Sequence, residues 1–204
     1  MSKKYKLAIV GATGLVGRTA LKVLEEKNLP NFEYKLFSSK KSAGNVLKFF
    51  GKDYVAYELK ENSFDEGFDF AIFSAGGETS KKYAPIAAQK GCIVIDNSSA
   101  FRMDENVPLV VPEVNSKDIK NNKGIIANPN CSTIQAVVAL KPLDDKYKIK
   151  RIVYSTYQAV SGAGKKGLED LTCKSSGNNL KKFPHSIYNN CLQHIDVFMQ
   201  DRLY

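Results

Sequence analysis

The sequence lacks any apolar run long enough to cross a membrane, and it lacks the pattern of a secretory leader. A transmembrane helix needs about 20 consecutive apolar residues, and no apolar run in the 204-residue chain approaches that length. The N-terminal residues MSKK lead into a short β-branched strand pattern instead of a signal peptide. We therefore expect a cytoplasmic protein that has no membrane partner.

Disulfide and metal-binding patterns are also missing. The chain has four cysteines, namely Cys92, Cys131, Cys173 and Cys191. None belongs to a CxxC pair, and two histidines are too few for a Cys/His zinc site of the usual spacing. We expect reduced thiols and no metal. His185 and His194 lie in a poorly periodic stretch, which favours a surface or packing role over catalysis.

The chain carries an excess of positive charge but no basic stripe. Its formal net charge is +9, yet the lysines come as scattered pairs without interleaved aromatic residues. Nucleic-acid binding requires basic residues clustered on one face, so nucleic acid is not an expected partner. A small anionic ligand near one or two of the pairs would also account for the charge.

Short apolar runs that alternate with helix-compatible segments dominate the first two thirds of the chain. The apolar content of 43% is sufficient for a sizeable core. The predicted strands lie at 6–10, 34–37, 54–58, 68–73, 92–96 and 124–127. The predicted helices lie at 18–25, 81–89 and 134–140. This alternation, without internal repeats, is typical of an α/β protein with a doubly wound parallel sheet of the Rossmann type.

A glycine-rich turn follows the first predicted strand. Residues 11–17 read GATGLVG and have the spacing GxxGxxG, one residue longer at its start than GxGxxG. Such glycines let the backbone approach a pyrophosphate, and the following helix supplies N–H donors. The flanking strand and helix favour dinucleotide binding over a turn needed only for packing. The candidate contacts are Gly11, Thr13, Gly14, Leu15 and Val16.

The second predicted strand ends in a loop that has no acidic residue. NAD-binding proteins usually place an Asp or Glu about 20 residues beyond the glycines, where it binds the ribose 2′-hydroxyl. Residues 38–44 read SSKKSAG instead, so hydroxyl and ammonium groups are offered at this point. Ser39, Lys41 and Ser42 therefore favour a 2′-phosphate and the cofactor NADP.

Two further loops follow predicted strands and carry ligand-binding side chains. Residues 74–80 read SAGGETS, a small-residue turn at the carboxyl end of a strand, where open α/β sheets bind ligands. Residues 96–102 read DNSSAFR. The planar fork of Arg102 matches phosphate or carboxylate, although the spacing alone is equally compatible with a surface arginine.

Residues 128–133 carry the most reactive chemistry in the sequence. They read NPNCST and lie between the apolar strand pattern at 124–127 and a helix-compatible apolar segment. Asn, Pro, Ser and Thr together form a helix start, so Cys131 is expected in or beside a first helical turn. The unpaired N–H groups there favour a thiolate. This placement favours a nucleophile over a small buried core residue.

With these motifs assembled, the chain resembles the N-terminal part of aspartate-semialdehyde dehydrogenase. The shared motifs occur in the same order to about residue 184 and lie at 11–17, 74–77, 96–102, 128–133 and 158–164. The resemblance implies NADP-dependent interconversion of L-aspartyl 4-phosphate with L-aspartate 4-semialdehyde and phosphate. That step is shared by lysine, threonine and methionine synthesis, and the family's enzymes are usually homodimers or homotetramers.

The resemblance also implies a role for individual residues. Cys131 matches the nucleophile, and Asn130 matches a neighbour that polarises the reacting carbonyl. Gln158 matches a residue that orients the substrate, and Arg102 matches a phosphate-binding arginine. Lys41 stands where an arginine is common beside the 2′-phosphate. The remaining candidates implied by the resemblance are Ser99 and Lys166 for substrate or phosphate, and Ala75, Gly76, Ser161 and Gly162 for the cofactor.

The pattern of the chain changes after residue 140. Beyond it we expect a half-solvated strand, a tight turn, a helix and a polar loop at 148–157, 158–164, 165–173 and 174–182. We therefore predict an NADP-binding domain over 1–143. Residues 144–204 are expected to begin an α+β catalytic and dimerisation domain.

Two alternatives to this enzyme remain open. N-acetyl-glutamyl-phosphate reductase shares the architecture and chemistry, but it usually has Gly where this chain has Asn130. The other alternative is a noncatalytic relative or truncated fragment that serves as a partner subunit. In the resembling family the general base is a histidine beyond residue 204, so we expect that the 204-residue chain is incomplete and has little activity alone.

Overall fold

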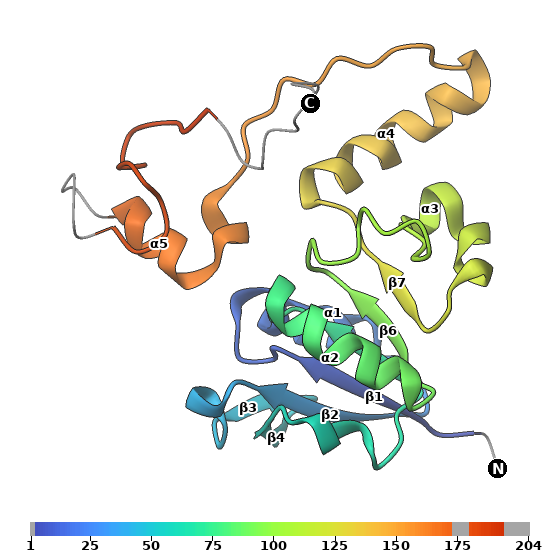
Figure 1. Cartoon of the computed structure of the whole chain (residues 1–204), viewed down its shortest axis with the longest axis vertical. Helices are drawn as coiled ribbons and strands as arrows, with labels where there is room; N and C mark the ends of the chain where they lie inside the picture. The colour runs from blue at the N-terminus through green and yellow to red at the C-terminus, as the bar shows by residue number, and fades with distance from the viewer. Residues whose placement is uncertain (1–2, 173–179, 194–204) are drawn as a thin grey trace. The chain divides into compact units, whose positions relative to one another are not determined.

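The computed structural model describes residues 3–172 and 180–193 of the chain (Figure 1). Contacts divide it into two compact units, Met1–Thr156 and Tyr157–Tyr204. Each unit is described by itself. Among the described residues, no helix is both long and apolar enough to span a membrane.

The first unit is built on a seven-stranded sheet with the order β3-β4-β2-β1-β5-β6-β7. All neighbouring strands are parallel except β3 and β4, which are antiparallel. The strands are β1 Tyr5–Val10, β2 Phe32–Ser38, β3 Val46–Phe49, β4 Lys52–Glu58, β5 Phe70–Phe73, β6 Ile93–Asp96 and β7 Ile125–Ala127. The predicted α/β class with a doubly wound, mostly parallel sheet is confirmed.

Helices and helical turns connect the strands. The α-helices are α1 Leu15–Lys27, α2 Gly77–Gln89, α3 Pro112–Asn115, α4 Cys131–Tyr147 and, in the second unit, α5 Gly164–Thr172. The 3-10 helices are η1 Lys40–Ser42, η2 Glu61–Phe64, η3 Ser116–Asn121 and η4 Val160–Ala163. Helices α1, α2 and α4 all begin earlier than the sequence predicted, at Leu15, Gly77 and Cys131. In α2 and α4 the first turn consists mainly of small or polar residues, and in α1 it contains Leu15 and Val16 within the glycine-rich motif.

Two clusters of buried side chains cover opposite faces of the sheet. Leu21 and Leu24 of α1 pack with Leu7, Ile9 and the other buried residues of one face. On the opposite face, Ala84 and Ala87 of α2 and Phe64 of η2 pack with the alternate residues of the same strands (Figure 1). Alternation along parallel strands therefore supplies apolar surface to helices on both sides.

Strand β3 was not predicted from the sequence. It forms a hairpin with β4 through Phe50 and Gly51, whose φ angles are +49° and +67°. Positive φ at both turn residues suits the twist of a tight hairpin. The signal was present in the alternation of exposed Val46 and Lys48 with buried Leu47 and Phe49 before a glycine.

The predicted strand over 148–157 is wrong. No described segment pairs with these residues, and Val153 and Tyr157 are 73% and 92% exposed. An alternating pattern becomes a strand only where a neighbour satisfies its backbone groups. The predicted domain boundary after residue 143 falls inside α4, whereas the contact division follows Thr156. That boundary stays a prediction.

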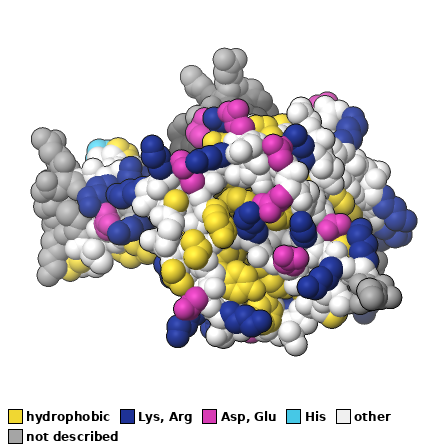
Figure 2. Space-filling model, turned by 90° about the horizontal axis from the view of Figure 1, so that it is seen from below, with side chains coloured by type: hydrophobic (Ala, Val, Ile, Leu, Met, Phe, Trp, Pro, Cys, Tyr) yellow, Lys and Arg dark blue, Asp and Glu magenta, His cyan; other side chains and the backbone are white. Residues whose placement is uncertain are grey.

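The surface of the molecule mixes charges of both signs. On the face that Figure 2 shows, Lys and Arg side chains alternate with Asp and Glu side chains around patches of hydrophobic atoms. Surface ion pairs such as Lys82–Glu61 at 3.1 Å and Lys90–Asp65 at 2.8 Å contribute to this mixture. Exposed pairs of this kind contribute little to stability.

Candidate active site

The candidate residues of the first unit lie where neighbouring parallel strands end. The turns after β1, β5, β6 and β7 each begin at the carboxyl end of a strand, and these four strands are adjacent in the sheet (Figure 1). The loop after β2 lies next to the turn after β1. Open α/β sheets bind ligands at this edge.

The turn after β1 is closely packed around two glycines. Gly11 has φ +86°, and a Cβ built there would be 2.9 Å from the carbonyl carbon of Ser74. A Cβ built on Gly17 would be only 2.1 Å from the carbonyl oxygen of Gly11. Any side chain at either position would therefore move α1 or the neighbouring turn.

The start of α1 is left open to solvent. Its N-cap is Gly14, which offers no side-chain hydrogen bond to the first helical N–H groups. Leu15 and Val16 are each 46% exposed, and the Arg18 guanidinium donates to the carbonyl of Thr13 at 3.1 Å. Uncapped N–H groups at a helix N-terminus suit an anionic ligand.

The turn after β5 lies against the turn after β1. The Ser74 hydroxyl and the Ser74 N–H both donate to the carbonyl of Val10, at 3.0 and 2.9 Å. Gly76 has φ +90° and serves as the N-cap of α2 without a capping side chain. Ala75 and Gly76 are exposed, so two open helix starts and two small-residue turns adjoin one another.

The loop after β2 carries the residues predicted to favour NADP. Ser39 precedes η1, and Lys41 and Ser42 lie within it. The backbone turn is closed by the Ser42 N–H, which donates to the carbonyl of Ser39 at 2.9 Å. The Ser39 and Lys41 side chains are exposed and Ser42 is half-buried.

Cys131 is the first residue of α4, as the sequence predicted. Asn130 is the N-cap, and its side-chain oxygen accepts the Ser132 N–H at 2.9 Å. Cys131 is exposed, as is Cys191, whereas Cys92 is buried. Burial raises the pKa of the Cys92 thiol to about 12, so that thiol has little thiolate at neutral pH.

Arg102 is fixed by two backbone carbonyls. Its Nε donates to the carbonyl of Asn128 at 2.9 Å, and its Nη2 donates to the carbonyl of Asn97 at 3.0 Å. The half-buried guanidinium thus joins the loop after β6 to the turn that precedes Cys131. Because a guanidinium has five N–H donors, others remain for an anion. Ser99, on the same loop, is exposed.

Asp96 and its partners were missed as a functional group by sequence reasoning. The Asp96 side chain is fully buried and accepts hydrogen bonds from Ser80 and Ser98. The Asn128 side-chain amide donates to that of Asn97. An acid at the end of an apolar strand, followed by Asn-Ser-Ser, is a signal that could have pointed to this network.

The other predicted site residues belong to the second unit. Gln158 is half-buried and lies just before η4, which contains Ser161 and Gly162. Lys166 is exposed on α5. Their grouping with Cys131 stays a prediction. His185 is exposed, whereas Cys173, His194 and most of the predicted 174–182 loop lie outside the described residues.

A buried carboxylate organises the second unit. Asp170 on α5 is 1% exposed and accepts the N–H groups of Lys181, Lys182 and Phe183 at 2.8, 2.8 and 3.0 Å. Desolvation by itself would raise the pKa of this carboxyl, but the three backbone hydrogen bonds and the Lys181 ammonium outweigh it. The net direction is a lowered pKa.

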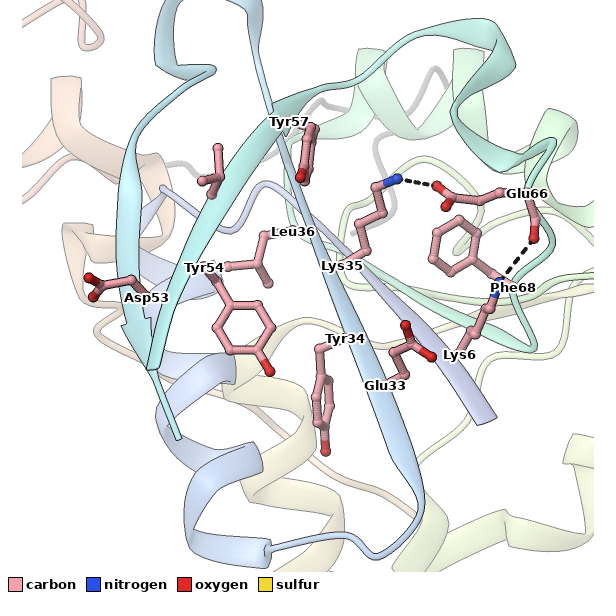
Figure 3. Close-up of a pocket in the computed structure, with 11 residues that line it drawn as sticks. Lys6, Glu33, Tyr34, Lys35, Leu36, Asp53, Tyr54, Tyr57, Glu66 and Phe68 are labelled. Atoms are coloured by element: carbon pink, nitrogen blue, oxygen red, sulfur yellow. Dashed lines mark hydrogen bonds and ion pairs between the residues drawn. The ribbon is translucent and has the colours of Figure 1, made fainter. Parts of the chain in front are cut away.

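A cavity of about 380 Å³ in the first unit is lined mainly by residues of strands β2 and β4 (Figure 3). Lys35 forms an ion pair with Glu66 at its edge, and the Lys6 ammonium donates to the Glu66 carbonyl at 3.3 Å. The other lining residues are Glu33, Tyr34, Leu36, Asp53, Tyr54, Val55, Tyr57 and Phe68. None of them was predicted as a site residue.

No cluster of three or more His, Cys, Asp or Glu side chains suited to a metal occurs among residues 3–172 and 180–193. The polar groups at the sheet edge include amides, hydroxyls, the Cys131 thiol and the cationic side chains of Arg18, Lys41 and Arg102. Such a set can bind anions, stabilise an oxyanion and form a covalent bond through sulfur.

Comparison with known proteins gives two family matches. Residues 6–122 match the model described as semialdehyde dehydrogenase, NAD binding domain, and residues 140–203 match the model described as semialdehyde dehydrogenase, dimerisation domain. The aspartate-semialdehyde dehydrogenase of Aquifex aeolicus is 61% identical over 97% of this chain and 61% of its own length. That of Campylobacter jejuni is 50% identical over 98% of this chain and 62% of its own length.

Solved structures agree with these matches. A crystal structure of aspartate semialdehyde dehydrogenase II from Vibrio cholerae, complexed with ASA, has a TM-score of 0.89 and 45% identity and covers 98% of this chain. An enzyme from Candida albicans with NADP has a TM-score of 0.60 and 27% identity, covering 72% of this chain and 48% of its own. The present chain spans about 62% of the Vibrio chain and thus less than two thirds of these relatives.

Proposed function

The chain belongs to the semialdehyde dehydrogenase family, and we propose that it serves as the N-terminal part of an NADP-dependent aspartate-semialdehyde dehydrogenase. The reaction converts L-aspartyl 4-phosphate to L-aspartate 4-semialdehyde and phosphate, with oxidation of NADPH, and it is reversible. The names of relatives that are 61% and 50% identical support this substrate over N-acetyl-glutamyl phosphate.

The observation that carries the proposal is the position of Cys131. It is exposed at the first residue of α4, at the end of a parallel strand, with Asn130 capping the helix. An acyl phosphate needs a soft nucleophile that displaces phosphate and holds the acyl group as a thioester. Helix N–H groups and an amide beside the sulfur suit both the thiolate and the oxyanion that develops.

The turns at the sheet edge fit NADP. Gly11 and Gly17 let the turn after β1 pack against Ser74 and against its own backbone, and the uncapped start of α1 beside this turn offers N–H groups to a pyrophosphate. Ser39 and Lys41 are exposed beside half-buried Ser42, without a carboxylate in that loop, and would hold the 2′-phosphate. When bound, NADPH supplies the hydride that converts the acyl group to the aldehyde.

Each remaining site residue has a separate task in this proposal. The Cys131 sulfur attacks the carbonyl carbon of the acyl phosphate, and the bond from that carbon to the phosphate oxygen breaks. Arg102 binds the departing phosphate through N–H groups not engaged by Asn97 and Asn128. Gln158 orients the substrate, and Ser99 and Lys166 assist in binding its charged groups.

The proposal extends to assembly and cellular role. The match of residues 140–203 to a dimerisation domain supports a homodimer or homotetramer. The reaction would supply the semialdehyde used in lysine, threonine and methionine synthesis, in the cytoplasm. Helix α4 contains no buried residue in the described chain, so its apolar side chains are available to a partner subunit.

Thioester formation can be tested without complete turnover. Incubation with L-aspartyl 4-phosphate should release about one equivalent of phosphate per chain, since a single nucleophile reacts once. Mass spectrometry of peptides should find the aspartyl group on Cys131. Cys131→Ser should abolish both signals without changing the circular dichroism spectrum. Acylation of another residue, or none in a folded chain, would contradict the proposal.

Turnover by the 204-residue chain is a separate expectation. A positioned general base contributes about 10²–10⁴-fold, and neither histidine of the chain lies in a motif of the family. Phosphate-dependent reduction of NADP by aspartate semialdehyde should therefore be slow compared with that of a full-length relative. Comparable rates would indicate that His185 or His194 serves as the base.

A further inference from the structure

The carboxylate of Asp96 connects two parts of the candidate site, the start of α2 and the loop that carries Arg102. Asp96 ends β6, its exposure is 0%, and it has three side-chain hydrogen bonds. Oδ1 accepts the Ser80 hydroxyl at 2.6 Å and the Ser98 N–H at 3.1 Å. Oδ2 accepts the Ser98 hydroxyl at 2.7 Å. Neither oxygen touches a candidate ligand contact directly, so Asp96 cannot be a catalytic residue in the proposed reaction.

One side of this network reaches the start of α2. Ser80 is fully buried in the first turn of that helix, and its N–H donates to the carbonyl of Gly76 at 3.1 Å. Gly76 belongs to the open turn that adjoins the glycine-rich turn after β1. The Asp96 carboxylate therefore fixes the end of β6 to the helix that begins at the proposed cofactor turn.

The other side reaches the Cys131 turn. The Ser98 hydroxyl also accepts the Ala100 N–H at 3.1 Å, which holds the loop that carries Arg102. Arg102 in turn bonds to the carbonyl of Asn128, three residues before Cys131. The main chain of Asp96 adds a direct link, because its carbonyl accepts the Asn128 N–H at 2.8 Å.

We propose that Asp96 is a positioning residue: its carboxylate, through Ser80 and Ser98, holds Arg102 and the Cys131 turn in register with the start of α2. The two carboxylate oxygens accept three hydrogen bonds, two from the Ser80 and Ser98 hydroxyls and one from the Ser98 N–H. Substitution by Asn keeps one acceptor oxygen, replaces the other by an NH₂ donor and removes the negative charge at nearly constant volume, so the Ser98 side of the network must rearrange. The role rests on the proposed function, in which Cys131 and Arg102 act together, but its test requires no turnover.

The cysteines of the chain provide the test. Asp96→Asn and the unsubstituted protein are alkylated with limiting reagent, and peptide mass spectrometry gives the alkylation rate at each cysteine. Cys131 reports on the site, buried Cys92 reports on folding, and exposed Cys191 serves as a reference. Neutral iodoacetamide and anionic iodoacetate are used in parallel. The ratio of their rates at Cys131 reports the local electrostatic potential at the sulfur, because nearby positive charge attracts the anionic reagent.

We expect iodoacetate to alkylate Cys131 about tenfold more slowly in Asp96→Asn than in the unsubstituted protein. This corresponds to an increase of about 1.4 kcal/mol in the activation free energy. Loss of the Asp96 charge by itself would raise the iodoacetate-to-iodoacetamide ratio, so a fall of this ratio at Cys131 reports displacement of Arg102. The ratio should stay constant at Cys191, while Cys92 remains protected. A role confined to stability would expose Cys92 without changing this ratio. Asp170→Asn is the matched control, since Asp170 is also buried and accepts several hydrogen bonds, and it should leave Cys131 unchanged.

The possible outcomes separate this inference from the proposed function. Unchanged rate and ratio at Cys131 in folded Asp96→Asn would overturn the positioning role and leave the enzyme assignment intact. If Cys131 is not the fastest thiol in unchanged protein, the nucleophile is wrong, yet the ratio still tests the network. If Asp96→Asn exposes Cys92, Ser98→Ala decides by the same criteria, and exposure of Cys92 in both variants would also overturn the inference.

Discussion

The two parts of the first unit differ in how completely they bury their apolar residues. Strands β1 to β6 and helices α1 and α2 contribute buried side chains to two apolar clusters. Helix α4 contributes none in the described chain, and Ile152, Val153 and Tyr154 beyond it are 45%, 73% and 53% exposed. The sheet, α1 and α2 bury their apolar faces against one another, whereas the segment after Cys131 presents apolar surface.

The candidate site includes residues from both the well-packed part and the exposed part of the first unit. Its proposed cofactor turns belong to the well-packed part, where backbone positions are fixed by glycine contacts and buried strands. Cys131 stands at the junction, held from the packed side by the bonds of Asn128 to Asp96 and Arg102. The position of the Cys131 sulfur is therefore determined by hydrogen bonds at the sheet edge. Helix α4 supplies the helix N-terminus without contributing to the core.

The largest expected effect sharpens the contrast in stability. Phe73 is fully buried, and its ring stacks on Phe64 with centroids 6.0 Å apart, so Phe73→Ala should lower the free energy of unfolding by about 3–5 kcal/mol. Leu143→Ala on α4, where the side chain is 49% exposed, should cost about 0.5 kcal/mol. Urea unfolding followed by circular dichroism measures both. Equal costs would show that α4 is packed as tightly as the sheet.

The next prediction tests whether close packing around the glycines determines the conformation of the proposed cofactor-binding turns. Gly17→Ala introduces a Cβ 2.1 Å from the Gly11 carbonyl oxygen and should cost about 1–3 kcal/mol of stability. NADPH affinity, measured by calorimetry, should fall about tenfold or more, the equivalent of ~1.4 kcal/mol. Lys22→Ala places an alanine on the exposed face of the same helix and should change neither. An unaltered NADPH affinity in folded Gly17→Ala would separate the turn from the cofactor.

The same contrast explains which elements the sequence could predict. Strands β1, β2, β5 and β6 are short runs rich in aliphatic and aromatic residues that are mostly buried or half-buried, and local patterning is enough to identify them. Cys131 at a helix start also followed from local capping chemistry. The strand expected at 148–157 failed because pairing depends on a partner distant in sequence, which a local pattern does not specify.

The Asp96 network shows a second limit of sequence patterns. Ser80, Asp96, Ser98 and Asn128 are separated by up to 48 residues in sequence, and their bonding depends on the β5-β6-β7 order of the sheet. Residue types indicated only that each could cap a local turn. Strand order brought them together, so the role of Asp96 became visible only in three dimensions.

A smaller effect concerns acid and is confined to the second unit. The native pKa of Asp170 is lowered, so its ionised form stabilises the native state above the unfolded pKa of about 3.8. This contribution is lost as the pH falls through the lowered native pKa. Protection of the Lys181 and Phe183 amides from hydrogen exchange should therefore decline in that acidic range and be weak in Asp170→Asn at every pH.

Glu169→Gln controls for charge loss on the same helix. The Glu169 carboxylate pairs with the Lys181 ammonium at 2.6 Å but accepts none of the three backbone N–H bonds. Its substitution should leave protection of the Phe183 amide close to that of the unchanged protein. If Glu169→Gln abolished protection as Asp170→Asn does, surface charge and not the buried carboxylate would organise this segment.

The smallest expected effect tests cofactor choice at the exposed rim of the packed part. Lys41→Glu should weaken NADPH binding about five- to tenfold and leave NADH binding nearly constant, because a solvated charge pair is worth at most about 1 kcal/mol and the reversal replaces attraction by repulsion. Lys40→Glu makes the same charge change one residue away in η1 and should have a smaller effect. Calorimetric titration of both coenzymes at two ionic strengths separates a specific contact from the electrostatic field of the whole loop, since salt screens exposed charges.

Tighter binding of NADH than NADPH by the unsubstituted protein would contradict the assignment of Ser39, Lys41 and Ser42 to the 2′-phosphate. Equal losses in the two lysine variants would assign the preference to the positive potential of the whole loop.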